Sequence, residues 1–94
     1  MNKQDYLLVC LMEELAEAQQ ACAKALRFGL DDHHPQTQLS NEDSLWNEIN
    51  DVYAILDLLK EQNVSVDRNE TRVKVKKEKV LHYMGYSVQK GKLD

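Results

Sequence analysis

The 94-residue sequence has few residues that interrupt a helix, since it contains only one Pro and three Gly. Long uninterrupted helices are therefore possible. Apolar residues make up 43% of the chain and charged residues 30%, a balance that argues against wholesale disorder and suits a small globular domain. We expect one domain over residues 1–94. A domain this short buries a modest core, and oligomerisation is a common remedy.

The sequence also lacks a long apolar run, since no stretch approaches the roughly 18 apolar residues of a membrane span. The apolar run at the start is short and is followed at once by Glu13, Glu14 and Glu17, so we predict neither a signal peptide nor a membrane partner. Cys10 and Cys22 are the only cysteines. We expect them to be reduced thiols in a cytoplasmic protein, packed as small core residues.

Basic residues are scarce in the first two thirds of the chain. Residues 1–67 carry 4 Lys or Arg against 13 Asp or Glu, a net charge of −9, whereas residues 68–92 carry 8 against 2, a net charge of +6. An acidic body attracts cations. A basic C-terminal helix and tail, from about residue 68, attracts phosphate groups or the acidic body itself.

The spacing of apolar residues predicts an all-α fold with helices over about residues 5–28, 40–63 and 69–84. Gly29 is a natural C-terminal cap for the first helix, and Ser40 is a natural N-cap for the second. The residues predicted to face inward recur at steps of three and four in the first two helices: Leu8, Leu11, Leu15, Ala18, Cys22 and Ala25, then Leu45, Ile49, Val52, Leu56 and Leu59, and in the third helix Val73, Val80 and Met84.

The first two helices are expected to form an antiparallel hairpin joined by a loop at residues 30–40, with the third helix as an addition. The alternation VKVKKEKV over residues 73–80 is also compatible with a strand, which remains an alternative for that segment. Two hairpins from two copies would form a four-helix core. We therefore predict a homodimer or homotetramer.

Two pairs of acidic residues occupy equivalent places on the first two helices. Glu14 and Glu17 are three residues apart, as are Glu48 and Asp51, so each pair shares a helix face. If the helices pack antiparallel, all four carboxylates can converge. Converging carboxylates repel one another unless a cation compensates, and hard oxygen ligands favour Mg²⁺, with Mn²⁺ as a substitute. The alternative is that these are solvated acids on amphipathic helices.

The sequence around these acids resembles a known family. EELAE at residues 13–17 followed by NEIND at residues 47–51 is similar to the ExxE…ExxD signature of the all-α nucleotide pyrophosphohydrolases, which include MazG, the dimeric dUTPases and the dCTP pyrophosphatases. KALRFG at residues 24–29, Asn41, ILDLL at residues 55–59 and the lysine-rich KKEKVLHYM extend the likeness over roughly residues 6 to 84.

The resemblance implies a catalytic and metal-binding role for Glu14, Glu17, Glu48 and Asp51. It also implies hydrolysis of a nucleoside triphosphate between the α- and β-phosphates, giving a nucleoside monophosphate and pyrophosphate. The chain departs from the usual EELGD pattern at Asn47, a non-ligand position, and at Asn50, where a side chain replaces a Gly beside the site. The gap between the two acidic pairs is also longer than in many members.

Three lysines are candidates for binding the phosphates of such a substrate. Lys24 lies on the same stripe of its helix as the first acidic pair and could meet a phosphate as a point charge, although a lysine there also favours the helix dipole. Lys76 and Lys79 are the predicted contacts if the basic segment covers the substrate. That segment could instead contact another subunit or form a solvated face, and nucleic acid is a distant third because aromatic residues for stacking are few.

The remaining candidates have simpler interpretations. Trp46 and Tyr53 could stack on a base, but a place in the core or a subunit interface is favoured. His33 and His34 are adjacent in a loop and are predicted to be solvated, because no other ligand lies at metal-binding spacing. The function predicted is thus Mg²⁺-dependent nucleotide pyrophosphohydrolysis. The rivals are a non-catalytic helical adaptor that binds a partner or nucleic acid through the basic segment, and a relative acting on another phosphorylated metabolite.

Overall fold

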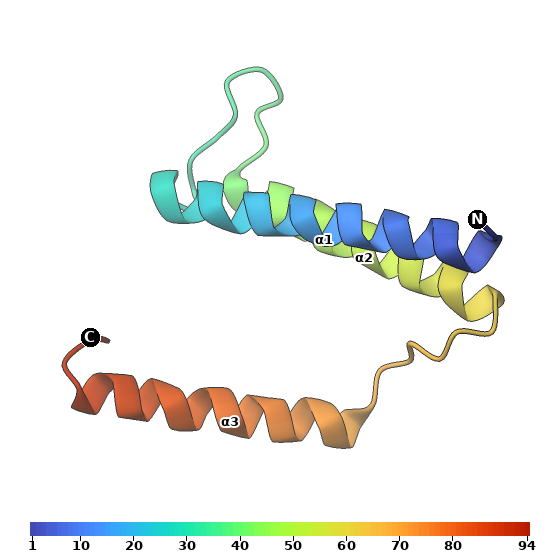
Figure 1. Cartoon of the computed structure of the whole chain (residues 1–94). Helices are drawn as coiled ribbons and strands as arrows, with labels where there is room; N and C mark the ends of the chain where they lie inside the picture. The colour runs from blue at the N-terminus through green and yellow to red at the C-terminus, as the bar shows by residue number, and fades with distance from the viewer.

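The computed structural model describes all 94 residues and confirms the all-α fold (Figure 1). Helix α1 spans Lys3–Phe28, α2 spans Asn41–Glu61 and α3 spans Glu70–Gln89. The first two helices pack as an antiparallel hairpin, as predicted. Helix α3 stands apart, since α1 and α2 are the only two elements with Cα atoms within 8 Å of each other.

Local capping explains where the hairpin helices begin and end. The Ser40 side chain accepts a hydrogen bond from the backbone N–H of Asp43, and the Asp43 side chain accepts one from the backbone N–H of Ser40, which together form a capping box. Gly29 ends α1 with a φ of +97°, and a Cβ at this position would lie 2.9 Å from a side-chain oxygen of Asp31. A glycine is therefore required here. Asn63 follows α2 with a φ of +64°, which agrees with the predicted end.

The interface between α1 and α2 follows a seven-residue repeat that differs in part from the predicted stripes. Its buried or half-buried positions are Leu7, Leu11, Glu14, Ala18, Ala21 and Ala25 on α1, and Leu45, Glu48, Val52, Ile55 and Leu59 on α2. The small side chains of Ala18 and Ala21, each 7% exposed, let the two helices approach closely along this face. The prediction that Cys22 is a core residue was wrong, because Cys22 is exposed, while Cys10 is half-buried.

Helix α3 differs from its prediction in length and in surroundings. It continues through Gly85 to Gln89, because a single glycine lowers helix propensity only by about 1 kcal/mol and no proline follows it. Residues 73–80 are helical, so the strand alternative was wrong. Val80 and Met84, expected to face inward, are each 46% exposed, because no other element packs on α3.

The chain by itself does not form a core of ordinary size. Only Ala18, Ala21 and Leu59 are buried, and the accessible surface is 7933 Å², whereas a compact monomer of this mass exposes about 5600 Å². The radius of gyration is 16.8 Å against about 12 Å for a compact domain of this length. Much of the surface is therefore of the kind that further packing would cover.

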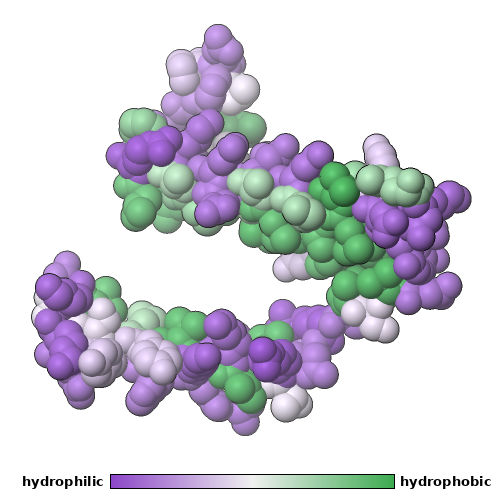
Figure 2. All heavy atoms as spheres, viewed as in Figure 1, coloured by the Kyte–Doolittle hydropathy of each residue, from purple (hydrophilic) through white to green (hydrophobic).

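The hairpin has a second apolar stripe on each helix, one residue after the interface positions. On α1 it consists of Leu8, Met12, Leu15, Cys22 and Leu26, and on α2 of Trp46, Ile49, Tyr53 and Leu56. We call these residues the apolar flank. One residue is a rotation of about 100°, and in an antiparallel pair the same rotation on both helices leads to the same side of the hairpin. Figure 2 shows apolar surface along the side of the hairpin that faces α3.

None of the three helices combines the length and the apolar character needed to cross a lipid bilayer.

Candidate functional site

Three of the four predicted acidic residues meet on the hairpin. Glu14 and Glu48 are both half-buried positions of the interface between α1 and α2, and Glu17 lies one turn after Glu14. One carboxylate oxygen from each of the three lies within 4.8 Å of the others. We call this group the acid cluster. Because Glu17 lies one residue before an interface position, it points to the side opposite the apolar flank.

Two oxygens of the acid cluster are shielded from solvent without a hydrogen-bond partner. They are Oε2 of Glu14 and Oε2 of Glu48. A shielded carboxylate oxygen without a donor is costly, and here the nearest charges are other carboxylates. A divalent cation would satisfy both oxygens at once and cancel the repulsion. The donor set, which is all oxygen, fits a hard cation such as Mg²⁺.

The electrostatics of the cluster are those of like charges held together. Desolvation first, and then the negative charges of Glu17 and Asp51, raise the pKa of Glu14 above its usual value. Desolvation also raises the pKa of Glu48, followed by a side-chain contact with Glu17 and by the negative charges of Glu17 and Asp51. Asp51 lies outside the cluster of three but adds its charge to it. Each shift has the sign expected when no cation is bound.

The raised pKa values predict how pH affects the protein in EDTA. The folded chain holds protons on Glu14 and Glu48 at pH values where the unfolded chain, with pKa values near 4.5, has released them. The contribution of Glu14 and Glu48 to the free energy of unfolding is therefore fully present below the unfolded pKa. It is lost as pH rises through the folded pKa. The melting temperature in EDTA should fall across this window. A Glu14→Gln/Glu48→Gln double variant should show a weaker fall, and equal pH profiles would contradict the prediction.

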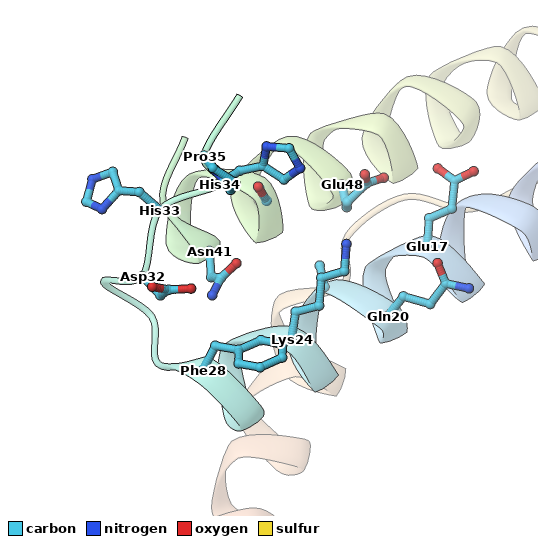
Figure 3. A pocket seen from close by; sticks show the side chains of 12 residues that line it. Glu17, Gln20, Lys24, Phe28, Asp32, His33, His34, Pro35, Asn41 and Glu48 are labelled. Atoms are coloured by element: carbon cyan, nitrogen blue, oxygen red, sulfur yellow. The ribbon is translucent and has the colours of Figure 1, made fainter. Parts of the chain in front are cut away.

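A cavity of about 470 Å³ adjoins the acid cluster and shares Glu17 and Glu48 with it (Figure 3). Its walls come from the second half of α1, the first turns of α2 and the loop between them. The other lining residues are Gln20, Ala21, Lys24, Phe28, Asp32, His33, His34, Pro35, Asn41 and Ser44. Figure 3 shows Lys24 between the cluster and the loop end of the cavity. The ammonium group of Lys24 therefore borders the same cavity as the carboxylates of Glu17, Glu48 and Asp32.

Hydrogen bonds tie the loop of residues 30–40 to both helices. The side-chain amide of Asn41 donates to the carbonyl of Gly29 at 2.8 Å, and the Asn41 backbone N–H donates to the carbonyl of Asp32 at 2.9 Å. Across the loop, His33 and Ser40 form an antiparallel bridge, and the N–H of His34 donates to the carbonyl of Leu39 at 2.8 Å. The loop is thus held by hydrogen bonds where it forms one wall of the cavity.

The structure sorts the other predicted site residues into two groups. Lys24 lines the cavity beside the acids. Lys76 and Lys79 lie on α3, where they border a separate groove together with Val80 and Met84, and α3 does not contact the hairpin. One chain therefore does not bring these two lysines to the acid cluster.

The aromatic and histidine residues have clear places. Trp46 and Tyr53 belong to the apolar flank, on the side away from the acid cluster, which favours an interface over base stacking. His33 and His34 are exposed, as predicted, but they also line the cavity, which the sequence analysis missed together with Phe28. The topology could have indicated this, because a loop that joins two helices must lie beside the helix ends that carry Lys24 and Asn41.

A search of protein-family models, of curated proteins and of solved structures finds no match to this chain.

Proposed function

We propose that this protein is a Mg²⁺-dependent nucleoside triphosphate pyrophosphohydrolase of the MazG-like kind, which cleaves the bond between the α- and β-phosphates. One observation carries the proposal: the acid cluster has two shielded, unpartnered oxygens and opens into a cavity that holds Lys24. A cation site beside a free ammonium group suits a polyanionic substrate. The resemblance of the EELAE and NEIND segments to the pyrophosphohydrolase signature supports the same conclusion.

Each residue of the site has a role in this proposal. Glu14, Glu17 and Glu48 would hold Mg²⁺, and Asp51 would add negative charge at its edge. When bound, the ion supplies positive charge against the phosphates and lowers the pKa of a coordinated water. Lys24 would meet a phosphate oxygen as a point charge.

The reaction is a hydrolysis that balances without a further reactant. A water oxygen joins one phosphorus of the α–β linkage, and the bridging P–O bond breaks to give a nucleoside monophosphate and pyrophosphate. A carboxylate of the acid cluster would take the proton of the attacking water. We assign this role to Glu14, because its Oε2 is shielded from solvent and has no hydrogen-bond donor to occupy it.

The direct test is a screen of nucleoside triphosphates with Mg²⁺ that measures pyrophosphate and orthophosphate separately. Pyrophosphate as the first phosphate product is expected. Orthophosphate as the first product would mean that a different bond is cut. No turnover with any nucleotide, together with no Mg²⁺ binding, would favour a non-catalytic adaptor, which has no use for the acid cluster.

Mg²⁺ should also stabilise the folded chain, because it would bind the acid cluster only when α1 and α2 are packed together. At about 100 times its Kd, a ligand of the native state adds about 2.7 kcal/mol, which corresponds to a rise in melting temperature on the order of 10 °C for a domain of this size. The measurement compares excess Mg²⁺ with NaCl of equal ionic strength, both after EDTA treatment. An unchanged melting temperature up to tens of millimolar Mg²⁺ would contradict a metal site.

We further propose that the apolar flank packs against a second copy of the chain. The exposed area exceeds that of a compact monomer by more than 2000 Å² per chain, whereas a standard interface needs about 800 Å² from each partner. Two hairpins joined by their apolar flanks would form a four-helix bundle. Their acid clusters would then remain open on the outer sides of the dimer.

A further inference from the structure

The cavity beside the acid cluster has two chemically different ends. At one end are Glu17 and Glu48, which belong to the acid cluster. At the other end are Asp32, Asn41 and Phe28, and Lys24 lies between the two ends (Figure 3). No lysine or arginine lines the loop end. Any phosphate drawn to the cation site and to Lys24 would therefore meet a carboxylate, and no fixed positive charge, further along the cavity.

The first turn of α2 does not make the loop end an anion-binding site either. Its backbone N–H groups are already used, because Asn41 donates to the carbonyl of Asp32, Glu42 to the carbonyl of Leu30 and Asp43 to the side chain of Ser40. A helix N-terminus binds a phosphate through free N–H groups. The loop end therefore suits an uncharged polar group with hydrogen-bond donors and a flat ring.

The side chains at the loop end fit such a group. Phe28 lines the cavity, and the Arg27 guanidinium lies over its ring at 5.4 Å from the centroid, which leaves the second ring face for stacking. The Nδ1 of His34 accepts hydrogen bonds from the backbone N–H groups of Gln36 and Thr37, at 3.2 and 3.4 Å. The neutral ring must then carry its proton on Nε2, which makes His34 a donor held in place by its own loop.

We propose that the loop end of this cavity, formed by residues 28–41, is the nucleoside subsite, and that Phe28 and His34 bind the base. This inference rests on the proposed hydrolysis for the orientation of the substrate. The phosphates would lie at the acid cluster and Lys24, and the base would stack on Phe28 while His34 donates to one of its acceptors. A volume of about 470 Å³ lies within the range of small-molecule sites. The loop would thus set which nucleotide is used, and the acids would carry the chemistry.

The test compares Phe28→Ala and His34→Asn with the control Gln36→Ala, whose exposed side chain lies in the same loop outside the cavity. Asparagine can still accept the loop N–H bonds, so His34→Asn removes the Nε2 donor while keeping the loop. Three quantities are measured: kcat and KM for nucleoside triphosphates, the inhibition constant of inorganic tripolyphosphate, and the Kd of nucleoside monophosphates by calorimetry. Circular dichroism checks that each variant keeps its helices.

For Phe28→Ala and His34→Asn we expect KM and the monophosphate Kd to rise about 10-fold or more, as expected for the loss of base stacking or of a hydrogen bond. We expect kcat to change by less than about 3-fold, and the tripolyphosphate inhibition constant and all values of Gln36→Ala to stay unchanged. An unchanged KM and Kd would overturn the subsite. So would a tripolyphosphate constant that rises in step with KM, because the loop end would then bind phosphate.

The failure of the proposed function is distinguishable from the failure of this subsite. If the wild-type chain releases no pyrophosphate, the hydrolysis is refuted, yet the monophosphate titrations still test the nucleoside subsite. If the wild-type chain hydrolyses nucleotides but the variants match it, the hydrolysis stands and the subsite is refuted. If the wild-type chain binds no monophosphate of any base at millimolar concentration, the subsite is refuted whatever the activity.

Discussion

The variant Glu48→Gln should release pyrophosphate at least about 100-fold more slowly than the wild-type chain, and it should remain folded. Glu48 contributes one of the two shielded oxygens of the acid cluster and also borders the cavity with Lys24. Glutamine keeps the shape and volume but removes the charge that would hold Mg²⁺ against the phosphates. Losing a major electrostatic contribution to the transition state typically lowers the rate by this factor.

The same substitution should leave stability unchanged or higher in EDTA, because it removes one of several repelling charges. That combination separates a functional role from a structural one, since a residue that mattered only for packing would lose stability together with activity. The matched control is Glu13→Gln, which removes a charge from an exposed position of α1 outside the acid cluster. Full activity in Glu48→Gln, or equal losses in both variants, would place the active site elsewhere.

The helices could be predicted from the sequence because their signals are local. The apolar spacing, the N-cap Ser40 and the C-cap Gly29 each act within a few residues, and the structure confirms the helices and the two caps. The exception is the end of α3, which was predicted near residue 84 but continues through Gly85 to Gln89. A glycine lowers helix propensity by about 1 kcal/mol, which does not end a helix that is otherwise favourable.

The faces of the helices were harder to predict than their lengths. Each hairpin helix has two neighbouring apolar stripes, so the predicted stripe combined residues from both: Leu11 and Ala18 face α2, whereas Leu8, Leu15 and Cys22 belong to the apolar flank. Periodicity alone does not say which stripe the chain buries on itself. The choice depends on tertiary packing, here on the close approach that Ala18 allows.

The site shows the same division between local and non-local information. The spacing of the acidic pairs predicted that Glu14, Glu17, Glu48 and Asp51 converge in an antiparallel hairpin. The structure brings the first three together and leaves Asp51 outside the cluster. The cavity could not be predicted in this way, since its loop end depends on the path of residues 30–40 and on bonds such as that from Asn41 to Gly29. The position of α3, with Lys76 and Lys79, could not be predicted either, since neither α1 nor α2 packs on this helix.

The second large effect is expected at the apolar flank, where Ile49→Arg should raise the dissociation constant of the dimer by about 100-fold or more. Ile49 is 40% exposed in the single chain, so an arginine fits there without disturbing α1, but in the proposed dimer it would bury an unpaired charge at a cost of several kcal/mol. Light scattering at micromolar concentration should show the wild-type chain as a dimer or larger, and Ile49→Arg shifted towards the 10.9 kDa monomer.

Ala16→Arg adds the same group on the side of α1 away from α2 and should keep the wild-type mass. A monomeric wild-type chain, or an Ile49→Arg variant as fully associated as Ala16→Arg, would show that the apolar flank does not join two copies.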